Sequence, residues 1–305
     1  MLKTNECNAC GSTDLYKYCR LGKYVFYKCR RCGLVLFANP PSERQMNRFY
    51  SYTDNDKLQD EISKVNPLLG KFRRHSVLMK PAYFWGNYIN KDRARAICKI
   101  FKSKKDLLDV GCGPGDFLNE MQKNHWHVYG TEIGDNLVIQ AQSKIGKKNI
   151  YKGKINKLVS KLEKLKINQI TLWHVFEHIY DIESTLKNLN KILQIKGWLT
   201  LEVPHSESLN FKLFKNKWTL LMVPQHLHFW NEDSLRLILK KFGYEIKKIE
   251  YPIHFPFIFA SSIIKADKYM FILLPLILPF SVLISVFFSL IKRGDIIRVY
   301  AQKRS

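Results

Sequence analysis

Short apolar runs alternate with amphipathic stretches from residue 104 to about residue 251 of this 305-residue chain. Four of the runs are short and flanked by polar or glycine-rich segments, as buried strands are: residues 106–110, 128–132, 169–175 and 198–203. Segments with helical periodicity, such as residues 182–193, separate them. Strands and helices in alternation predict an α/β fold with a doubly wound, mostly parallel sheet.

Two zones precede this region. Residues 1–40 are rich in cysteine and aromatic side chains and end at Asn39-Pro40-Pro41-Ser42, a cluster that is typical of a boundary. Residues 41–95 are polar with scattered aromatic residues, and they predict a helical linker or lid. The α/β domain is then predicted over residues 96–305, with 244–251 and 296–303 as the last two strands of its sheet.

Residues 252–292 interrupt the α/β domain before its last predicted strand and are strongly apolar. Residues 269–291 carry no charge over 23 positions, which is long enough to span a bilayer, and Lys292 and Arg293 follow at once. Because the flanking strands must join one sheet, the chain has to leave and return on the same side. We therefore expect a helical hairpin that dips into a membrane or lies on it. A hydrophobic homodimer interface or a core extension is the alternative.

The formal net charge of +24 changes this picture little. Such a charge favours phosphates, anionic lipid headgroups or acidic substrates, but lysine supplies 37 of the 50 basic residues and occurs in every zone. A global compositional bias explains the charge equally well. Residues 1–7 lack the apolar core of a secretory signal, and four of the 7 cysteines form a metal-like pattern, so we expect a cytoplasmic protein.

Two cysteine pairs lie in the N-terminal zone, Cys7-x-x-Cys10 and Cys29-x-x-Cys32, and a glycine follows each pair. Four thiolates in this arrangement can close a tetrahedral zinc site, and the glycines permit tight turns that aim backbone amides at the sulfur atoms. The pattern predicts a small zinc ribbon in which Zn²⁺ is structural, because four thiolates leave no open coordination position. Cys19 lies between the pairs and is expected to be a bystander.

A glycine-rich turn after the first strand of the α/β domain is the most informative stretch. Asp109 lies near the end of the strand, Gly111, Gly113 and Gly115 follow, and a helix begins after them. Such a turn lets a ligand approach the backbone closely, and the helix N-terminus offers amide groups to it. The next strand ends at Glu132, whose carboxylate can accept both hydroxyls of a ribose. The glycine spacing differs from the G-x-G-x-x-G fingerprint of dinucleotide-binding proteins.

This stretch resembles the cofactor-binding turn of class I S-adenosylmethionine-dependent methyltransferases. The resemblance implies a seven-stranded Rossmann-like sheet, in which Asp109 and the three glycines surround the methionine end of S-adenosylmethionine. It also implies that Glu132 holds the ribose and that Ile133 lies against the adenine. One position departs from the family: Gly-Asp usually follows the third strand, whereas this chain has Gly153-Lys154, so an amine replaces the carboxylate that reaches the adenine.

We expect the segments after the fourth strand to contain the residues that bind the methyl acceptor. Glu177-His178 resembles a signature of many small-molecule methyltransferases, and residues 224–230 resemble the substrate-side loop of a bacterial subgroup that accompanies surface-polysaccharide pathways. Methyl transfer is an in-line displacement in which positioning alone can contribute ~7–11 kcal/mol. A neutral histidine is the natural base near neutral pH, and the candidates are His178, His226 and His228, with His205 behind them.

The leading functional prediction is transfer of a methyl group to a small-molecule or lipid-linked glycan-type acceptor, by an enzyme peripheral or monotopic on the cytoplasmic membrane. An RNA base methyltransferase that uses the zinc ribbon and the basic surface is the alternative. Nucleic acid is disfavoured because arginines are few and the Asn-Pro-Pro-aromatic tetrad used on flipped bases is absent. A cofactor-binding scaffold without turnover is a second alternative, which Lys154 keeps open.

Overall fold

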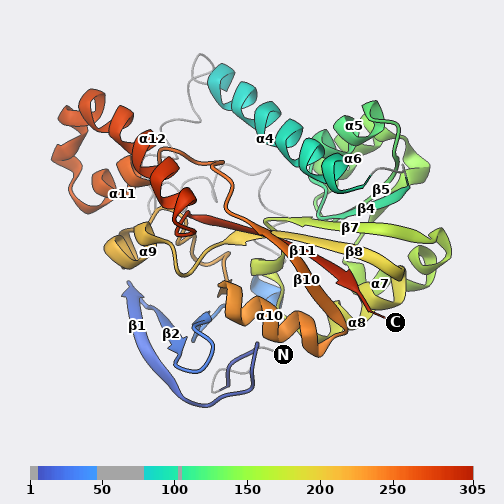
Figure 1. The fold of residues 1–305 in the computed structure, drawn as a ribbon, viewed down its shortest axis with the longest axis horizontal. Coiled ribbons are helices and arrows are strands. Elements are labelled where there is room, and N and C mark those ends of the chain that lie inside the picture. Colours follow the sequence, from blue (N-terminus) through green and yellow to red (C-terminus); the bar gives the residue numbers. More distant parts are fainter. Residues whose placement is uncertain (1–5, 47–78, 102–104, 305) are drawn as a thin grey trace. The chain divides into compact units, whose positions relative to one another are not determined.

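The computed structural model describes residues 6–46, 79–101 and 105–304 (Figure 1). Their contacts divide the chain into two compact units, one containing Met1–Pro41 and Gln169–Ser305 and the other Ser42–Asn168. Part of the predicted helical linker at 41–95, residues 47–78, lies outside the described residues. Helix α4, Met79–Ile100, begins after it. The division of the chain into domains at residues 40 and 95 stays a prediction.

A seven-stranded mixed sheet has the order β10-β11-β8-β7-β4-β5-β6. The pairs β4–β5 and β5–β6 are parallel, whereas β11 runs antiparallel to both β10 and β8. The strands are β4 Asp106–Val110, β5 His127–Glu132, β6 Ile150–Lys152, β7 Ile167–Trp173, β8 Leu193–Pro204, β10 Tyr244–Glu250 and β11 Ile296–Lys303. The predicted α/β fold class is confirmed, with the predicted runs inside β4, β5 and β8 and overlapping β7.

Amphipathic helices connect these strands, as their spacing of apolar residues predicts. Helix α5 buries Phe117, Leu118 and Met121 along one face. Helix α8 begins at the cap residue Asp181, whose side chain accepts a hydrogen bond from the Ser184 amide at 3.0 Å. The helices are α5 Asp116–Lys123, α6 Asp135–Ile145, α7 Ile155–Leu162, α8 Ile182–Ile192, α9 Leu209–Phe214 and α10 Glu232–Lys241.

A second, four-stranded sheet contains the N-terminal ribbon, in the order β1-β2-β3-β9. Strands β1 Leu15–Leu21, β2 Tyr24–Cys29 and β3 Val35–Phe37 come from the ribbon, but β9, His228–Phe229, comes from the segment after β8. Val35 pairs with Phe229, and Leu36 pairs with His228. The ribbon is therefore built into the same sheet as the predicted substrate-side loop.

The predicted apolar insertion is helical and lies between β10 and β11. It contains α11 Ile258–Ala266, a 3-10 helix at Lys268–Leu273 and α12 Leu274–Leu290. Figure 1 shows α11 and α12 side by side at the end of the insertion, in orange and red. Among the described residues, Tyr269–Leu290 is the one helical stretch long and apolar enough to cross a membrane, and 17% of its most apolar window is buried.

Candidate active site

The glycine-rich turn after β4 has the backbone conformation that glycine favours. Gly111, Gly113 and Gly115 have φ values of 72°, 54° and 80°, which strain other residues. A Cβ atom on Gly115 would lie 3.2 Å from the Ala141 backbone, so the absence of a side chain lets α5 and α6 pack closely. A Cβ atom on Gly113 would meet nothing within 4 Å. The turn is thus tight on one side and open at Gly113, as close approach by a cofactor requires.

The Glu132 carboxylate lies at the end of β5 and organises this turn. Its Oε2 accepts a hydrogen bond from the Gly113 amide at 2.9 Å, and its Oε1 accepts from the amides of Ile133 and Gly134 at 2.7 and 2.9 Å. Asp109 is 2% exposed within β4. The predicted cofactor residues Asp109, Glu132 and the glycines thus lie along β4, β5 and their shared turn, and they fit S-adenosylmethionine.

The adenine side of the predicted site is less complete. Ile133 is 39% exposed and leaves an apolar surface beside Glu132. Lys154 precedes α7, and its Nζ lies 2.5 Å from Glu43 Oε1. The ion pair draws the Lys154 amine to Glu43, and no carboxylate takes the position that is usual in the family.

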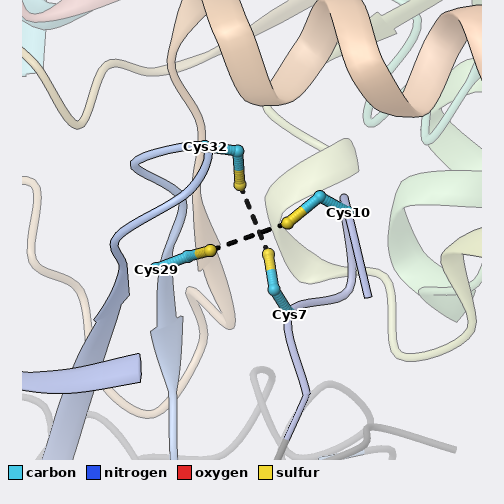
Figure 2. Close-up of side chains that lie close together, drawn as sticks. All are labelled: Cys7, Cys10, Cys29 and Cys32. Carbon is cyan, nitrogen blue, oxygen red and sulfur yellow. Dashed lines mark hydrogen bonds between the residues drawn. The ribbon is translucent and has the colours of Figure 1, made fainter. Parts of the chain in front are cut away.

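The four ribbon cysteines converge at one point (Figure 2). The Sγ atoms of Cys7 and Cys32 lie 3.4 Å apart, those of Cys10 and Cys29 lie 3.6 Å apart, and all four lie within 4.8 Å of one another. Thiolates bound to one Zn²⁺ at about 2.3 Å are separated by about 3.8 Å, so this cluster fits a tetrahedral metal site. Cys19 belongs instead to the apolar core, where burial raises its pKa to about 11.

The cysteine cluster reaches the predicted substrate-side loop through His228. Asn8, between the first two cysteines, donates from Nδ2 to His228 Nε2 at 2.8 Å. His228 is fully buried, and burial lowers its pKa to about 3. The structure thus places His228 in the ribbon sheet and not with the other two predicted bases. The sequence alone gave no signal of Asn8 as a partner.

His178 and His226, by contrast, come together although 48 positions separate them. Their rings lie 4.8 Å apart between centroids. Glu177 lies with them, because one ligand atom from each of the three side chains falls within 4.8 Å of the others. The amide of Leu227 donates to the Glu177 carbonyl at 2.9 Å and fixes the loop to the turn after β7. We call Glu177, His178 and His226 the acceptor-side trio, after the acceptor role that the sequence predicts for this segment.

His174 connects the trio to a second buried carboxylate. Its Nδ1 lies 3.3 Å from Glu177 Oε1, and its Nε2 lies 3.4 Å from Glu202 Oε1. Burial opposes a charge on His174, but hydrogen bonds to both carboxylates outweigh it and raise the pKa. Burial lowers the pKa of His226 to about 3, and the neighbouring His178 adds to this effect. The shifts thus favour the charged form of His174 and the neutral form of His226.

A buried ion-pair network continues beyond Glu202. Arg298 on β11 donates from Nε to Glu202 Oε2 at 2.7 Å, and His254 Nδ1 lies 3.1 Å from Glu202 Oε1. No role was predicted for Glu177, His174 or this network. The Glu-His pair after β7 was the available signal for Glu177, whereas the partners from β8, β11 and the insertion are remote in sequence.

Known proteins resemble this chain in its α/β region. The family described as "Methyltransferase domain" matches residues 84–249. The ubiquinone biosynthesis O-methyltransferase of Nitrosospira multiformis is 24% identical over 159 residues, which are 48% of this chain and 64% of that protein. The matched part of the chain therefore spans less than two thirds of that relative.

Two solved structures share the fold. The magnesium protoporphyrin IX methyltransferase of Synechocystis PCC 6803, solved with SAH bound, has a TM-score of 0.53 at 15% identity, covering 87% of this chain and 100% of that one. A SAM-dependent methyltransferase from Archaeoglobus fulgidus has a TM-score of 0.50 at 17% identity, covering 71% and 94%. The family match, the seven-stranded sheet and the glycine turn agree: the chain belongs to the methyltransferase-domain family, within the class I S-adenosylmethionine-dependent methyltransferases.

Proposed function

We propose that this enzyme methylates a small-molecule or lipid-linked glycan-type acceptor at the cytoplasmic face of a membrane. The observation that carries the proposal is the inverted polarity of α12. Its serines point inward: Ser281 and Ser285 are 0% and 6% exposed, and both donate to the Pro256 carbonyl, at 2.8 and 3.0 Å. Its large apolar side chains point outward: Leu276, Phe280, Leu283, Phe287 and Leu290 are all exposed.

Such a surface favours lipid over water. A water-facing helix buries its apolar side and exposes its polar one, and α12 does the reverse. Each leucine or phenylalanine moved from water into lipid contributes ~1.5–3 kcal/mol. Lys292 and Arg293 follow the helix and suit an anionic membrane surface. Both ends of the insertion join neighbouring strands of one sheet, which supports a hairpin on one side of the membrane and not a single span.

The insertion also contacts the acceptor side of the enzyme. The Phe255 ring lies 5.8 Å from the His174 ring, and His174 holds Glu177. The Thr219 hydroxyl bonds Ser261 on α11 at 2.8 Å, and Thr219 lies in the loop that leads to His226. A lipid-linked acceptor could thus extend from the bilayer along the insertion toward the trio.

The chemistry follows from the family. S-adenosylmethionine, when bound, supplies an activated methyl group, and Asp109, Gly111, Gly113, Gly115, Glu132 and Ile133 are the residues that we propose hold it. The trio is the proposed site where an acceptor group is positioned and loses its proton. Zn²⁺ on Cys7, Cys10, Cys29 and Cys32 is proposed as structural, because its four thiolates would leave no position for a substrate. The relative named for ubiquinone biosynthesis supports a small-molecule acceptor.

Label transfer tests the acceptor class. The purified enzyme is incubated with S-adenosylmethionine carrying a tritiated methyl group and an extract of cells from which its gene has been deleted. We expect label in the low-molecular-weight or solvent-extractable fraction, with little change on moderate addition of salt. Label in RNA that falls steeply with salt would instead support the base methyltransferase, and no incorporation in any fraction would support the scaffold.

Vesicle flotation tests the membrane surface. We expect the wild-type protein to float with phosphatidylglycerol vesicles and a variant carrying Leu276→Asp, Leu283→Asp and Leu290→Asp to remain in the dense fraction. A matched control, Ile139→Asp with Ile195→Asp, changes equally exposed side chains outside the insertion and should still float. A wild-type protein that does not float, and that is dimeric only while the three leucines are present, would establish the homodimer interface in place of the membrane.

A further inference from the structure

Both histidines of the acceptor-side trio are held in one tautomer by the same loop. The Nδ1 of His178 lies 2.9 Å from the Gln225 carbonyl oxygen, and the Nδ1 of His226 lies 2.9 Å from the Leu220 carbonyl oxygen. A carbonyl oxygen only accepts, so each Nδ1 must carry the proton and donate it. Each Nε2 therefore carries a lone pair. An imidazole that donates its other N–H to a main-chain carbonyl is the usual arrangement of a histidine that binds a metal ion.

Glu177 supplies the third ligand. Its side chain is 0% exposed, and its Oε2 has no hydrogen-bond partner among the described residues. A buried carboxylate oxygen without a partner is costly unless a cation satisfies it. The His174 ring contacts only Oε1. The position of Oε2 thus points to a positive charge next to the two histidines.

We propose that Glu177, His178 and His226 bind a divalent first-row transition-metal ion, in a second metal site apart from the four cysteines. Two histidines and one glutamate form a ligand set of catalytic zinc sites, which keep an open coordination position for water or substrate. Ligand atoms about 2.0–2.2 Å from one ion lie within about 4.4 Å of one another. The trio, whose ligand atoms lie within 4.8 Å, closes on an ion if the half-buried His178 ring moves slightly.

The two metal sites would do different things. The cysteine cluster would be closed and would serve the fold, whereas the three ligands of the trio would leave one coordination position for an oxygen atom of the acceptor. An acceptor hydroxyl bound there would have a lowered pKa, lose its proton to water, and attack the methyl carbon as the carbon–sulfur bond of S-adenosylmethionine breaks. This catalytic role rests on the proposed function. The binding of the ion does not, and it can be tested without an acceptor.

Titration of the untagged, metal-free protein with Co²⁺ separates the two sites spectroscopically. Cobalt on the cysteines gives a thiolate-to-cobalt charge-transfer band, and cobalt on the trio gives visible ligand-field bands without it. We expect wild-type protein to bind one equivalent of each kind. The variants His178→Ala and Glu177→Gln should keep the charge-transfer band, which shows that the ribbon is folded. Their affinity for the second cobalt ion, measured from the ligand-field bands, should fall by at least about tenfold.

His127→Ala is the matched control, because it removes an exposed histidine outside the trio, and it should bind both equivalents. A wild-type protein that saturates with the charge-transfer band alone would overturn the proposal. So would a second equivalent that persists unchanged in both trio variants. If cobalt binds the trio but no acceptor is methylated, the proposed function fails and the metal site stands.

Discussion

The proposed cofactor side and the proposed acceptor side of this protein are built in different ways. From β4 to β5, the residues proposed to hold S-adenosylmethionine lie within a stretch of about 25 positions, and Glu132 bonds the amide of Gly113 directly. On the acceptor side, Glu177, His226 and Glu202 come from three separate segments. Strand β9 from that side even pairs with β3 of the N-terminal ribbon.

This difference indicates where each side draws its stability. The glycine turn depends on local geometry, namely positive φ angles and one carboxylate at a strand end. The acceptor side depends on long-range ties, among them Asn8 to His228 and Arg298 to Glu202. We therefore expect changes remote from the trio to disturb the acceptor side while cofactor binding stays intact.

Removal of the ribbon metal should give the largest difference between the two sides, because it should disturb the acceptor side and leave cofactor binding intact. A variant with Cys29→Ser and Cys32→Ser should lose its zinc completely, because two of four thiolates are gone and metal binding supplies most of the stability of so small a ribbon. Strand β9 would then lose its partner β3, so amide hydrogen exchange over residues 224–230 should accelerate. Affinity for S-adenosylmethionine, measured by calorimetry, should stay within about threefold, which is ~0.65 kcal/mol.

The matched control for this experiment is Cys19→Ser, which removes a ribbon thiol outside the cluster and should keep the zinc. Elemental analysis that still finds zinc in the double variant would contradict the ligand set. Unchanged exchange over residues 224–230 after zinc loss would contradict the structural link between ribbon and loop.

Glu132→Ala should affect the cofactor side alone. Hydrogen bonds to a charged group are worth ~1.5–3 kcal/mol, so we expect affinity for S-adenosylmethionine to fall about 10-fold to 150-fold in calorimetry. Zinc content should not change. Glu163→Ala removes an exposed glutamate of the same unit and should bind like the wild type. Equal affinity in wild type and Glu132→Ala, or a preference for a nicotinamide dinucleotide, would argue against the proposed cofactor residues.

Features that depend on local sequence were predictable. The strands were marked by apolar runs between polar segments, and β11 has the predicted bounds, residues 296–303. The glycine spacing and Glu132 follow a short pattern because a tight turn and a strand end set their positions. The cysteine pairs converge as expected, since the short spacing within each pair already favours a shared centre.

Features that depend on long-range packing were not predictable from one sequence. Strand β9 is only two residues long, and nothing local indicates that it pairs with the ribbon. The hydropathy of residues 269–291 predicted a helix, but the inward direction of Ser281 and Ser285 depends on the carbonyl of Pro256. His226 and His228 have similar neighbours, yet tertiary contacts place one in the trio and the other against Asn8.

Acid should loosen the acceptor side by a smaller, graded amount, through His205. This residue follows β8, is 2% exposed, and its Nδ1 donates to the Gly294 carbonyl at 3.0 Å, which ties two segments 89 positions apart. Burial lowers its pKa from 6.5 to about 4, against a smaller opposing effect of that hydrogen bond. Between pH 4 and pH 6.5 the unfolded chain binds a proton at this imidazole, whereas the folded protein does not. The stability that His205 contributes is thus complete above pH 6.5 and is lost as the pH falls toward 4, by up to ~1.4 kcal/mol per pH unit.

His205→Asn keeps a donor for Gly294 and removes the titration, so urea unfolding from pH 6.5 to 4.5 should depend less steeply on pH than in the wild type. Equal slopes in wild type and His205→Asn would show that the buried imidazole is not what makes the acceptor side sensitive to acid.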